Sequence, residues 1–293
     1  MKKRSIVILS LGLLLVGACK PDKSTDILER SNIIAWCIVP FDANERGPVE
    51  RAAMLKELGI TKLAYDYRAR HIPQFRDEIR ILEEEGIELS AVWLWVQAME
   101  DNKLDPDSES IVRIVEETGV NTEFWISFPE EFFGDMDDEA KFQKAVKTIR
   151  KLDERFRKSG CSIALYNHGA WFGDPENQIR IIEAIGSETI GIVYNFHHAH
   201  HEIDKFETLF PKMLPYLTAV NLNGMIKDGQ KIVTIGEGEE ELNMIRVVTA
   251  SGYDGPVGIL GHTEGEDIRV VLERNLLGLE EIKRDLEKLP EVQ

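Results

Sequence analysis

Cysteine is scarce in this chain, and its scarcity excludes a fold built on disulfides. Three cysteines occur among 293 residues: Cys19, Cys37 and Cys161. Cys37 and Cys161 each lie in an apolar run, in segments that we place on opposite sides of the domain. We therefore expect two buried free thiols rather than a disulfide bond, and stability that comes from a hydrophobic core.

A hydrophobic run long enough to span a membrane is also missing near the N-terminus. The apolar residues 6–16 cover about 16 Å as a helix, against a hydrocarbon core of roughly 30 Å. They follow three basic residues and precede Val16-Gly17-Ala18-Cys19, a pattern typical of a bacterial lipoprotein signal. We interpret residues 1–18 as a signal peptide, Cys19 as the lipidated residue and 19–31 as a polar tether. An ordinary secretory signal is the alternative.

Positive charge is in deficit, with 35 Lys and Arg against 52 Asp and Glu, a net charge of −17. The signal peptide carries three basic and no acidic residues, so its removal changes −17 to −20. Such a surface repels phosphate backbones, which argues against nucleic-acid binding. We expect a protein of the bacterial cell envelope, attached to the membrane only through its lipid.

A glycine-rich dinucleotide fingerprint is absent too. The first apolar strand is followed by Val39-Pro40-Phe41-Asp42, where a Gly-x-Gly-x-x-Gly turn would stand. We therefore expect no nucleotide cofactor.

The chain does contain eight apolar runs of strand length that alternate with amphipathic helical stretches. Glycines close several of these stretches, and nearly all-apolar strands are typical of a parallel sheet covered on both faces. The pattern predicts one (β/α)8 TIM barrel of the α/β class over residues 32–293. An open doubly wound sheet is the alternative, but it gives no reason to stop at eight strands. The expected strands are residues 33–39, 62–66, 87–96, 121–127, 162–167, 190–196, 218–223 and 256–261.

The placement of histidine is the strongest functional signal, because active sites of such barrels lie at the C-terminal strand ends. We expect His198 to face the site, and His262 and Glu264 to be candidate acid/base groups. Glu264 could instead be a charge favoured at a helix N-terminus. The seventh histidine, His71, follows the second strand. The other six fall at or just after strand ends: His168, His197, His198, His200, His201 and His262.

Aromatic and amide side chains near the same ends suit a sugar. Trp171, in the loop after the fifth strand, offers a face on which a sugar ring can stack, unless it packs on the core. Asn221 and Asn223 lie two residues apart and are expected to face the same space. Trp93 and Trp95 on the third strand are expected to belong to the core.

Four sequence blocks stand at or near the expected strand ends: Ala64-Tyr65-Asp66-Tyr67-Arg68, Tyr166-Asn167-His168-Gly169, Val193-Tyr194-Asn195-Phe196-His197-His198 and Ile235-Gly236-Glu237-Gly238-Glu239. In these blocks the chain resembles the xylose isomerase-like TIM-barrel family of sugar isomerases and epimerases, from residue 33 to about residue 279. The resemblance implies a sugar or glycoside as ligand. Endonuclease IV shares the superfamily, but the acidic charge and expected export oppose a role in DNA repair.

The resemblance also implies a divalent metal, held by Glu, Asp, His and Glu on the fifth to eighth strands, that polarises the sugar carbonyl. Here these positions read Tyr166, Asn195, Asn221 and a place near Gly261 or His262, so none of the ligands carries over. Two accounts remain open. In the first, which is slightly favoured, Zn, Mn or a similar ion is held by histidines, with Glu264 as a further ligand. The histidines of this set are His168, His198 and His262. In the second, no catalytic metal is present.

We therefore expect a sugar-active enzyme that moves a proton next to a carbonyl, as an isomerase, an epimerase or a keto-glycoside lyase. A phosphorylated substrate is disfavoured because Arg68 and Arg70 are the only cationic groups near the strand ends. The candidate catalytic residues are His168, His198, His262 and Glu264. The candidate substrate-binding residues are Asp66 with Arg68 as an orienting pair, His71, Trp171, Asn195, Asn221 and Asn223.

Two other functions remain open. The first is a non-catalytic sugar-binding lipoprotein that has lost the metal carboxylates. The second, a hydrolase that uses Glu130 and Glu131, is less well supported because adjacent side chains point apart.

Overall fold

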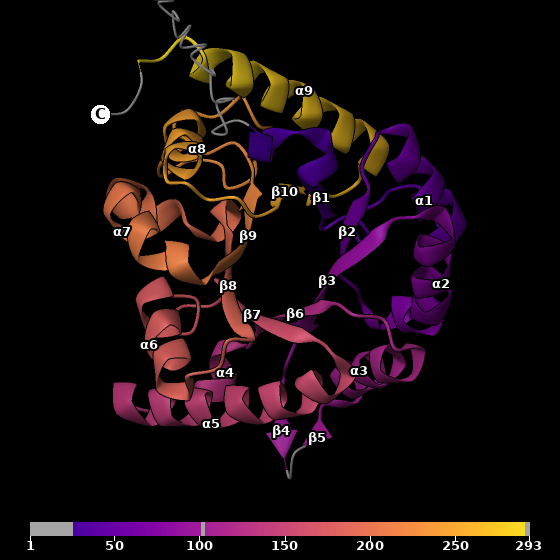
Figure 1. Ribbon diagram of the computed structural model, residues 1–293, viewed down its shortest axis with the longest axis vertical. Helices are drawn as coiled ribbons and strands as arrows, with labels where there is room; N and C mark the ends of the chain where they lie inside the picture. Colours follow the sequence, from indigo (N-terminus) through magenta and orange to yellow (C-terminus); the bar gives the residue numbers. More distant parts are fainter. Residues whose placement is uncertain (1–25, 101–102, 291–293) are drawn as a thin grey trace, which may run out of the picture.

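Eight parallel strands close into a barrel surrounded by helices in the computed structural model of the chain, which describes residues 26–100 and 103–290 (Figure 1). The strands are hydrogen-bonded in the cyclic order β1-β10-β9-β8-β7-β6-β3-β2, which confirms the predicted (β/α)8 barrel. The strands are β1 (Ile33–Trp36), β2 (Lys62–Tyr65), β3 (Glu88–Trp95), β6 (Glu123–Ser127), β7 (Ser162–Tyr166), β8 (Ile190–Asn195), β9 (Leu217–Leu222) and β10 (Val257–Leu260). A hairpin of β4 (Met99–Glu100) and β5 (Lys103–Leu104) projects beside α3.

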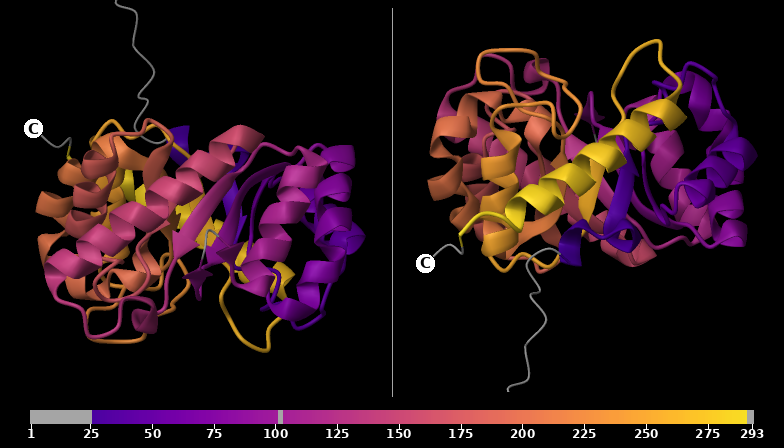
Figure 2. Two further views of the ribbon diagram at one scale, coloured as in Figure 1. Left: turned by 90° about the horizontal axis from the view of Figure 1, so that it is seen from below. Right: turned by 90° about the horizontal axis from the view of Figure 1, so that it is seen from above.

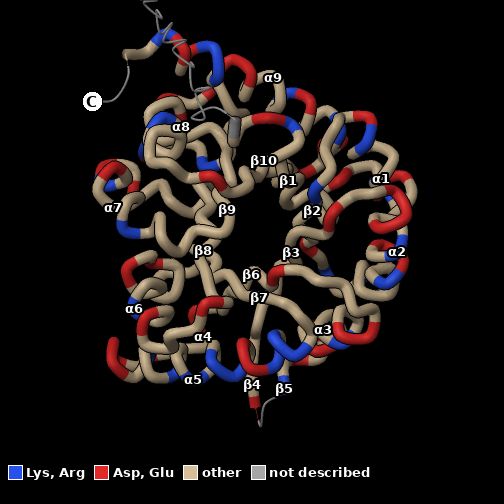
Figure 3. Tube along the Cα trace, in the orientation of Figure 1, with Lys and Arg blue, Asp and Glu red and all other residues tan. Residues whose placement is uncertain are grey.

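The helices wrap the barrel (Figure 2), and most of the charged residues lie on these helices and the adjoining loops (Figure 3). Proline occupies the first turn of α1, α3 and α6, where its missing N–H costs nothing. Gly86 and Gly119 end α2 and α3 with φ of 68° and 71°, the left-handed conformation expected of glycine there. The helices are α1 (Pro48–Glu57), α2 (Phe75–Glu85), α3 (Pro106–Thr118), α4 (Glu130–Phe133), α5 (Asp138–Phe156), α6 (Pro175–Ile185), α7 (Phe206–Met213), α8 (Glu241–Ala250) and α9 (Ile268–Leu286).

The inside of the barrel is filled by small residues at mid-height and by large rings above them. Alanines of β2, β3, β7 and β9 pack in one interior cluster with the rings of Trp36, Trp125 and Tyr166. The Trp36 ring meets the Trp125 ring edge-on at a centroid distance of 4.9 Å and the Tyr166 ring at 5.8 Å. This aromatic layer closes the barrel and forms the floor of the space above it.

The domain begins earlier than predicted. The signal peptide, Cys19 and the first part of the predicted tether lie outside the described residues. Residues 26–32, however, form two short 3-10 turns, in which Ile27 and Leu28 are buried. The amide of Asn32 donates to the carbonyls of Ile27 and Gly255, so the last residues of the predicted tether belong to the barrel. Among the described residues, no helix has the length and apolarity needed to cross a bilayer.

Candidate active site

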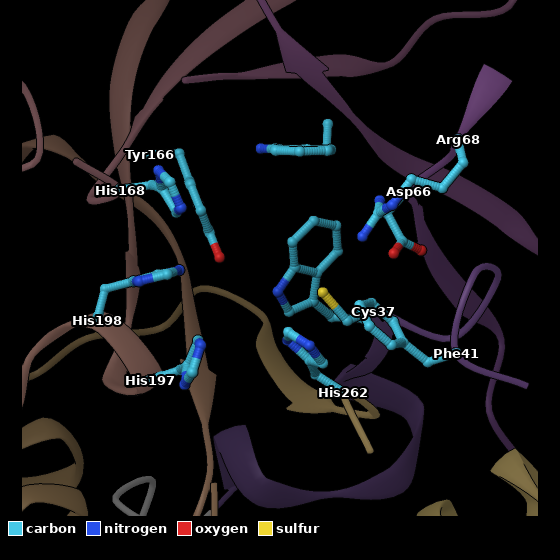
Figure 4. Close-up of a pocket in the computed structure, with 11 residues that line it drawn as sticks. Cys37, Phe41, Asp66, Arg68, Tyr166, His168, His197, His198 and His262 are labelled. Carbon is cyan, nitrogen blue, oxygen red and sulfur yellow. The ribbon is translucent and has the colours of Figure 1, made fainter. Parts of the chain in front are cut away.

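A cavity of about 160 Å³ opens above the aromatic floor at the C-terminal end of the barrel, where catalytic sites of this fold lie. Figure 4 shows the imidazoles of His168, His197 and His198 on one wall, and Asp66 and Cys37 on the opposite wall. The cavity is lined by Trp36, Cys37, Phe41, Asp66, Arg68, Trp93, Tyr166, His168, His197, His198 and His262. We call this space the histidine cavity.

The ends of β7 and β8 are tied together beneath the imidazole wall. Asn167 accepts a hydrogen bond from the Asn195 backbone N–H at 2.8 Å and donates to the Asn195 carbonyl at 3.0 Å. The Asn195 side chain donates to the Tyr166 hydroxyl at 2.6 Å and accepts from the His197 backbone N–H at 3.1 Å. These bonds fix the positions from which His168 and His198 project.

Two glycines shape the loop that carries His168. Gly169 has φ +87°, and a Cβ on Gly173 would lie 2.2 Å from the Gly169 carbonyl oxygen. Only glycine permits this close backbone approach. The tight loop holds the His168 ring edge-on to the His198 ring, with a centroid distance of 4.6 Å.

The imidazoles form a cluster whose members disfavour protonation. Burial lowers the pKa of His198 to about 2 and that of His197 to about 4, with mutual repulsion as a further cause. Burial also lowers the pKa of His168 and His262. At neutral pH the cluster is therefore uncharged, and each neutral ring presents one N–H donor and one acceptor.

Asp66 lies on the opposite wall, at the end of β2, and is 1% exposed. Its Oδ1 accepts a weak hydrogen bond from the Val39 N–H at 3.3 Å, and its Oδ2 has no hydrogen-bond partner among the described residues. Burial raises the pKa of Asp66 to about 6. The carboxylate is thus poised to exchange a proton near neutral pH.

Cys37 faces the cavity beside Asp66 because of its backbone. Successive strand residues normally point to opposite sides, yet Trp36 and Cys37 both line the cavity. Cys37 adopts φ +56°, a left-handed conformation uncommon for a non-glycine residue. Burial and the nearby Asp66 raise the pKa of this thiol well above its usual value, so it stays protonated. The structure confirms that Cys37 and Cys161 are free and buried.

The remaining wall is aromatic and cationic. The His262 ring lies 3.8 Å from the Phe41 ring between centroids, and the Arg68 guanidinium lies 5.3 Å above the Phe41 ring. Arg68 donates to the Tyr67 carbonyl and forms no ion pair with Asp66 among the described residues. Both residues line the cavity, and their predicted role as a pair that orients the substrate stays a prediction.

Five of the predicted site residues reach the histidine cavity: His168, His198, His262, Asp66 and Arg68. Three predicted amide binders do not, because their side chains are buried in the fold. Asn195 supports Tyr166, and Asn223 donates to the carbonyls of Gly224 and Lys231. Asn221 occupies the space above Gly258, where a Cβ would lie 1.8 Å from its Oδ1.

Three further predictions place residues in the wrong location. His71 turns back on the chain and accepts from the Arg68 backbone N–H. Trp171 donates to Asp138 and lines a separate cavity with Phe133 and Phe172. Glu264 is exposed on the loop between β10 and α9, which projects beyond the barrel in Figure 2.

The residues that stand at the family's metal-ligand positions are not suited to hold a metal ion. Burial raises the pKa of Tyr166 well above its usual value, so the phenol stays protonated, and Asn195 donates to it. Asn221 lies outside the cavity lining, and the inward residue at the end of β10 is Leu260, packed with Trp36.

The histidines do not replace these ligands. His262 lies against Phe41 and His197, apart from the His168–His198 pair. In residues 26–100 and 103–290, no three His, Cys, Asp or Glu side chains are grouped as metal ligands, so the predicted set of His168, His198 and His262 is not assembled.

Sequence reasoning missed six residues that line the cavity. Trp36 and Tyr166 could have been found from period-two alternation, because each lies two residues after an inward-facing residue of its strand, Ile34 and Ala164. Trp93 was expected in the core, but it borders the cavity. Cys37 points inward through an unusual backbone conformation that composition does not reveal. The missed residues are Trp36, Cys37, Phe41, Trp93, Tyr166 and His197.

Comparison with known proteins identifies the family to which the fold and the sequence correspond. Residues 52–274 match the family described as "Xylose isomerase-like TIM barrel". No curated protein gives a significant sequence match.

Solved structures share the fold. The 3-keto-D-glucoside 4-epimerase YcjR from E. coli is 14% identical, with a TM-score of 0.63 over 87% of this chain and 99% of that chain. A D-psicose 3-epimerase crystallised with D-fructose is 13% identical, with the same TM-score and coverage. A xylose isomerase-like barrel from Mycobacterium smegmatis in complex with magnesium is 17% identical, with a TM-score of 0.56 over 86% and 97% of the chains.

Proposed function

The chain belongs to the xylose isomerase-like TIM-barrel family, and we propose that it is a sugar-active enzyme that moves a proton on a carbon next to a carbonyl. One observation carries this proposal: a buried carboxylate with a pKa of about 6 faces a wall of neutral imidazoles across one cavity. A base with a pKa near the working pH is the most effective one for such a transfer.

In this proposal Asp66 acts as the general base. Its carboxylate takes the proton from the carbon, and the C–H electron pair forms the carbon–carbon double bond of an enediolate. The carbonyl oxygen, which gains the negative charge, accepts hydrogen bonds from His198 and His168. Neutral imidazoles are suited to this role, because a neutral ring can donate its N–H to the developing oxyanion.

Return of the proton decides the product. Delivery to the neighbouring carbon gives an isomer, and delivery to the opposite face gives an epimer. Where the next carbon carries a glycosidic oxygen, expulsion of that oxygen gives elimination. The protonated Cys37 thiol, beside Asp66, and His262 are further groups in the cavity that can supply a proton.

We propose that the reaction needs no metal ion, because the positions expected to hold the metal ligands are occupied by other residues. Because Tyr166, Asn195 and Asn221 stand where the family resemblance places three of the metal ligands, we propose that imidazole N–H groups supply the charge stabilisation that the resemblance assigns to a divalent ion. A non-catalytic sugar-binding protein is the second candidate, favoured by the same loss of carboxylate ligands.

A solvent-exchange assay separates the two candidates. Purified protein is incubated in D2O with ketoses and 3-keto-glycosides, and NMR follows deuterium at the carbons next to the carbonyl. We expect exchange on at least one compound, a large loss in His198→Ala, and wild-type exchange in Trp171→Ala, whose ring lies outside the cavity. Binding by calorimetry without any exchange would favour the sugar-binding protein.

We further propose that the protein is anchored in the bacterial cell envelope through lipid on Cys19. Expression of the full chain and of Cys19→Ala in a bacterial host tests this idea. The lipid-bearing form belongs in the membrane fraction with an increased N-terminal mass, and Cys19→Ala belongs in the soluble fraction. Equal fractionation of both would overturn the anchor.

A further inference from the structure

A second cavity adjoins the histidine cavity and has no role in the proton transfer. It has a volume of about 260 Å³ and shares Arg68 and Trp93 with the first cavity. Beyond these it is lined by the rim residues Trp95, Gln97 and Asp107. Because Arg68 and Trp93 border both spaces, the second cavity lies directly beside a ligand seated over the imidazoles.

Two tryptophans form the wall of this second cavity. Trp93 and Trp95 stand two residues apart on β3, so their side chains leave the strand on the same face. Their ring centroids lie 5.6 Å apart with a tilt of 34°. Both rings are partly exposed, although aromatic rings of this size are usually covered in a barrel.

Hydrogen bonds to neighbouring elements hold the wall formed by Trp93 and Trp95 in place. The Trp93 indole N–H donates to the Ser127 hydroxyl at 2.9 Å. The Ser108 hydroxyl donates to the Trp95 carbonyl at 3.0 Å, and Asp105 accepts from the Gln97 backbone N–H at 3.1 Å. The first bond fixes the Trp93 ring against β6, and the other two join the end of β3 to the N-terminal end of α3. Both ties reduce the ordering cost of binding.

Polar groups rim the aromatic wall. The side chains of Gln97 and Asp107 take part in no hydrogen bond or ion pair within the part of the chain that the structure describes, and Arg68 contributes a cation. A flat apolar face with an amide, a carboxylate and a guanidinium around it suits a sugar ring, whose C–H face stacks while its hydroxyls bond the rim.

We infer that Trp93, Trp95, Gln97 and Asp107 form a subsite for the second sugar unit of a glycoside whose reacting sugar occupies the histidine cavity. This inference rests on the proposed function and specifies its substrate class as a disaccharide or longer glycoside. The rim carries one guanidinium, Arg68, and one carboxylate, Asp107, which suits the hydroxyls of a neutral sugar unit.

Calorimetry with matched sugars tests the subsite. The probes are D-glucose and its disaccharides cellobiose, maltose and trehalose, titrated into the wild type, the Gln97→Ala/Asp107→Ala double variant and Trp95→Ala. Trp95 also lies 5.0 Å from the His168 ring, so the double variant provides an independent probe that leaves the imidazole wall untouched. Trp171→Ala is the matched tryptophan control.

We expect at least one disaccharide to bind about ten-fold more tightly than D-glucose, the equivalent of roughly 1.4 kcal/mol. This ratio should fall toward one in Trp95→Ala and in the double variant, and stay unchanged in Trp171→Ala. A wild-type ratio near one, or a ratio that both subsite variants leave intact, overturns the subsite. Retained deuterium exchange on a monosaccharide would then show that the proposed function stands, whereas absence of both binding and exchange would refute both.

Discussion

Replacement of Asp66 by asparagine should abolish proton transfer and at the same time stabilise the fold. The carboxylate is fully buried, accepts one weak hydrogen bond, and has no ion-pair partner among the described residues. Asparagine has nearly the same shape and keeps an oxygen that can accept from the Val39 N–H. It removes only the buried charge.

The size of the effect follows from the pKa of Asp66. Burial raises this pKa from 3.8 to about 6, and a ten-fold change in an acid dissociation constant corresponds to about 1.4 kcal/mol. Because the pKa is higher in the folded chain, the stability linked to this group is complete below pH 3.8 and is lost as the pH rises through about 6. At pH 8 the ionised carboxylate therefore costs about 3 kcal/mol, and at pH 5 roughly half of that.

Urea unfolding of the wild type and Asp66→Asn at pH 5 and pH 8 measures this cost. We expect the variant to be more stable at both values, with the larger gain at pH 8. Asp42→Asn is the matched control, because Asp42 is also buried but pairs with Arg46 at 2.8 Å, so its loss should destabilise the fold. Destabilisation by Asp66→Asn at pH 8 would refute the description of Asp66 as a poorly compensated buried charge.

Three further predictions concern the imidazole wall. Because the pKa values of His197 and His198 are lowered to about 4 and 2, the stability linked to them is complete above pH 6.5 and is lost as the pH falls. This pair should make the free energy of unfolding about 4 kcal/mol lower at pH 5 than at pH 7. In urea titrations, His198→Asn should remove about half of that loss. Asn167→Ala removes both bonds to Asn195 and should lower the free energy of unfolding by about 2 kcal/mol, while a neutral effect would show that the tie is dispensable. Gly173→Ala places a Cβ 2.2 Å from a carbonyl oxygen, so exchange activity should fall at least ten-fold with the far-UV circular dichroism unchanged; full activity would contradict the role of this loop.

The barrel was predictable from the sequence because its signals are local and repeated. Apolar runs, amphipathic stretches and helix-ending glycines such as Gly86 and Gly119 each report on a few neighbouring residues, and eight repeats leave little choice of topology. Strand ends were located within a few residues. Histidines after those ends therefore fell at the cavity, as His168, His198 and His262 show.

Side-chain roles were less predictable, because they depend on neighbours that lie far apart in the sequence. Asn195 has a polar side chain at a strand end, but its hydrogen bonds are used by Tyr166 and His197. Trp171 was expected to stack on the sugar, but its hydrogen bond to Asp138 holds it outside the cavity. Trp93 was expected in the core, but it borders the cavity. Nor does sequence spacing reveal the left-handed backbone that turns Cys37 inward.

In the proposed reaction, Asp66 and neutral imidazoles move a substrate proton without a metal ion. The most direct measurement is deuterium incorporation from D2O into the responsive ketose or keto-glycoside, followed by NMR with EDTA present, for the wild type and Asp66→Asn. We expect the wild type to exchange at the same rate with and without EDTA, and Asp66→Asn to be at least about 100-fold slower. Exchange that stops in EDTA and returns with a divalent ion, or that survives in Asp66→Asn, would contradict this account.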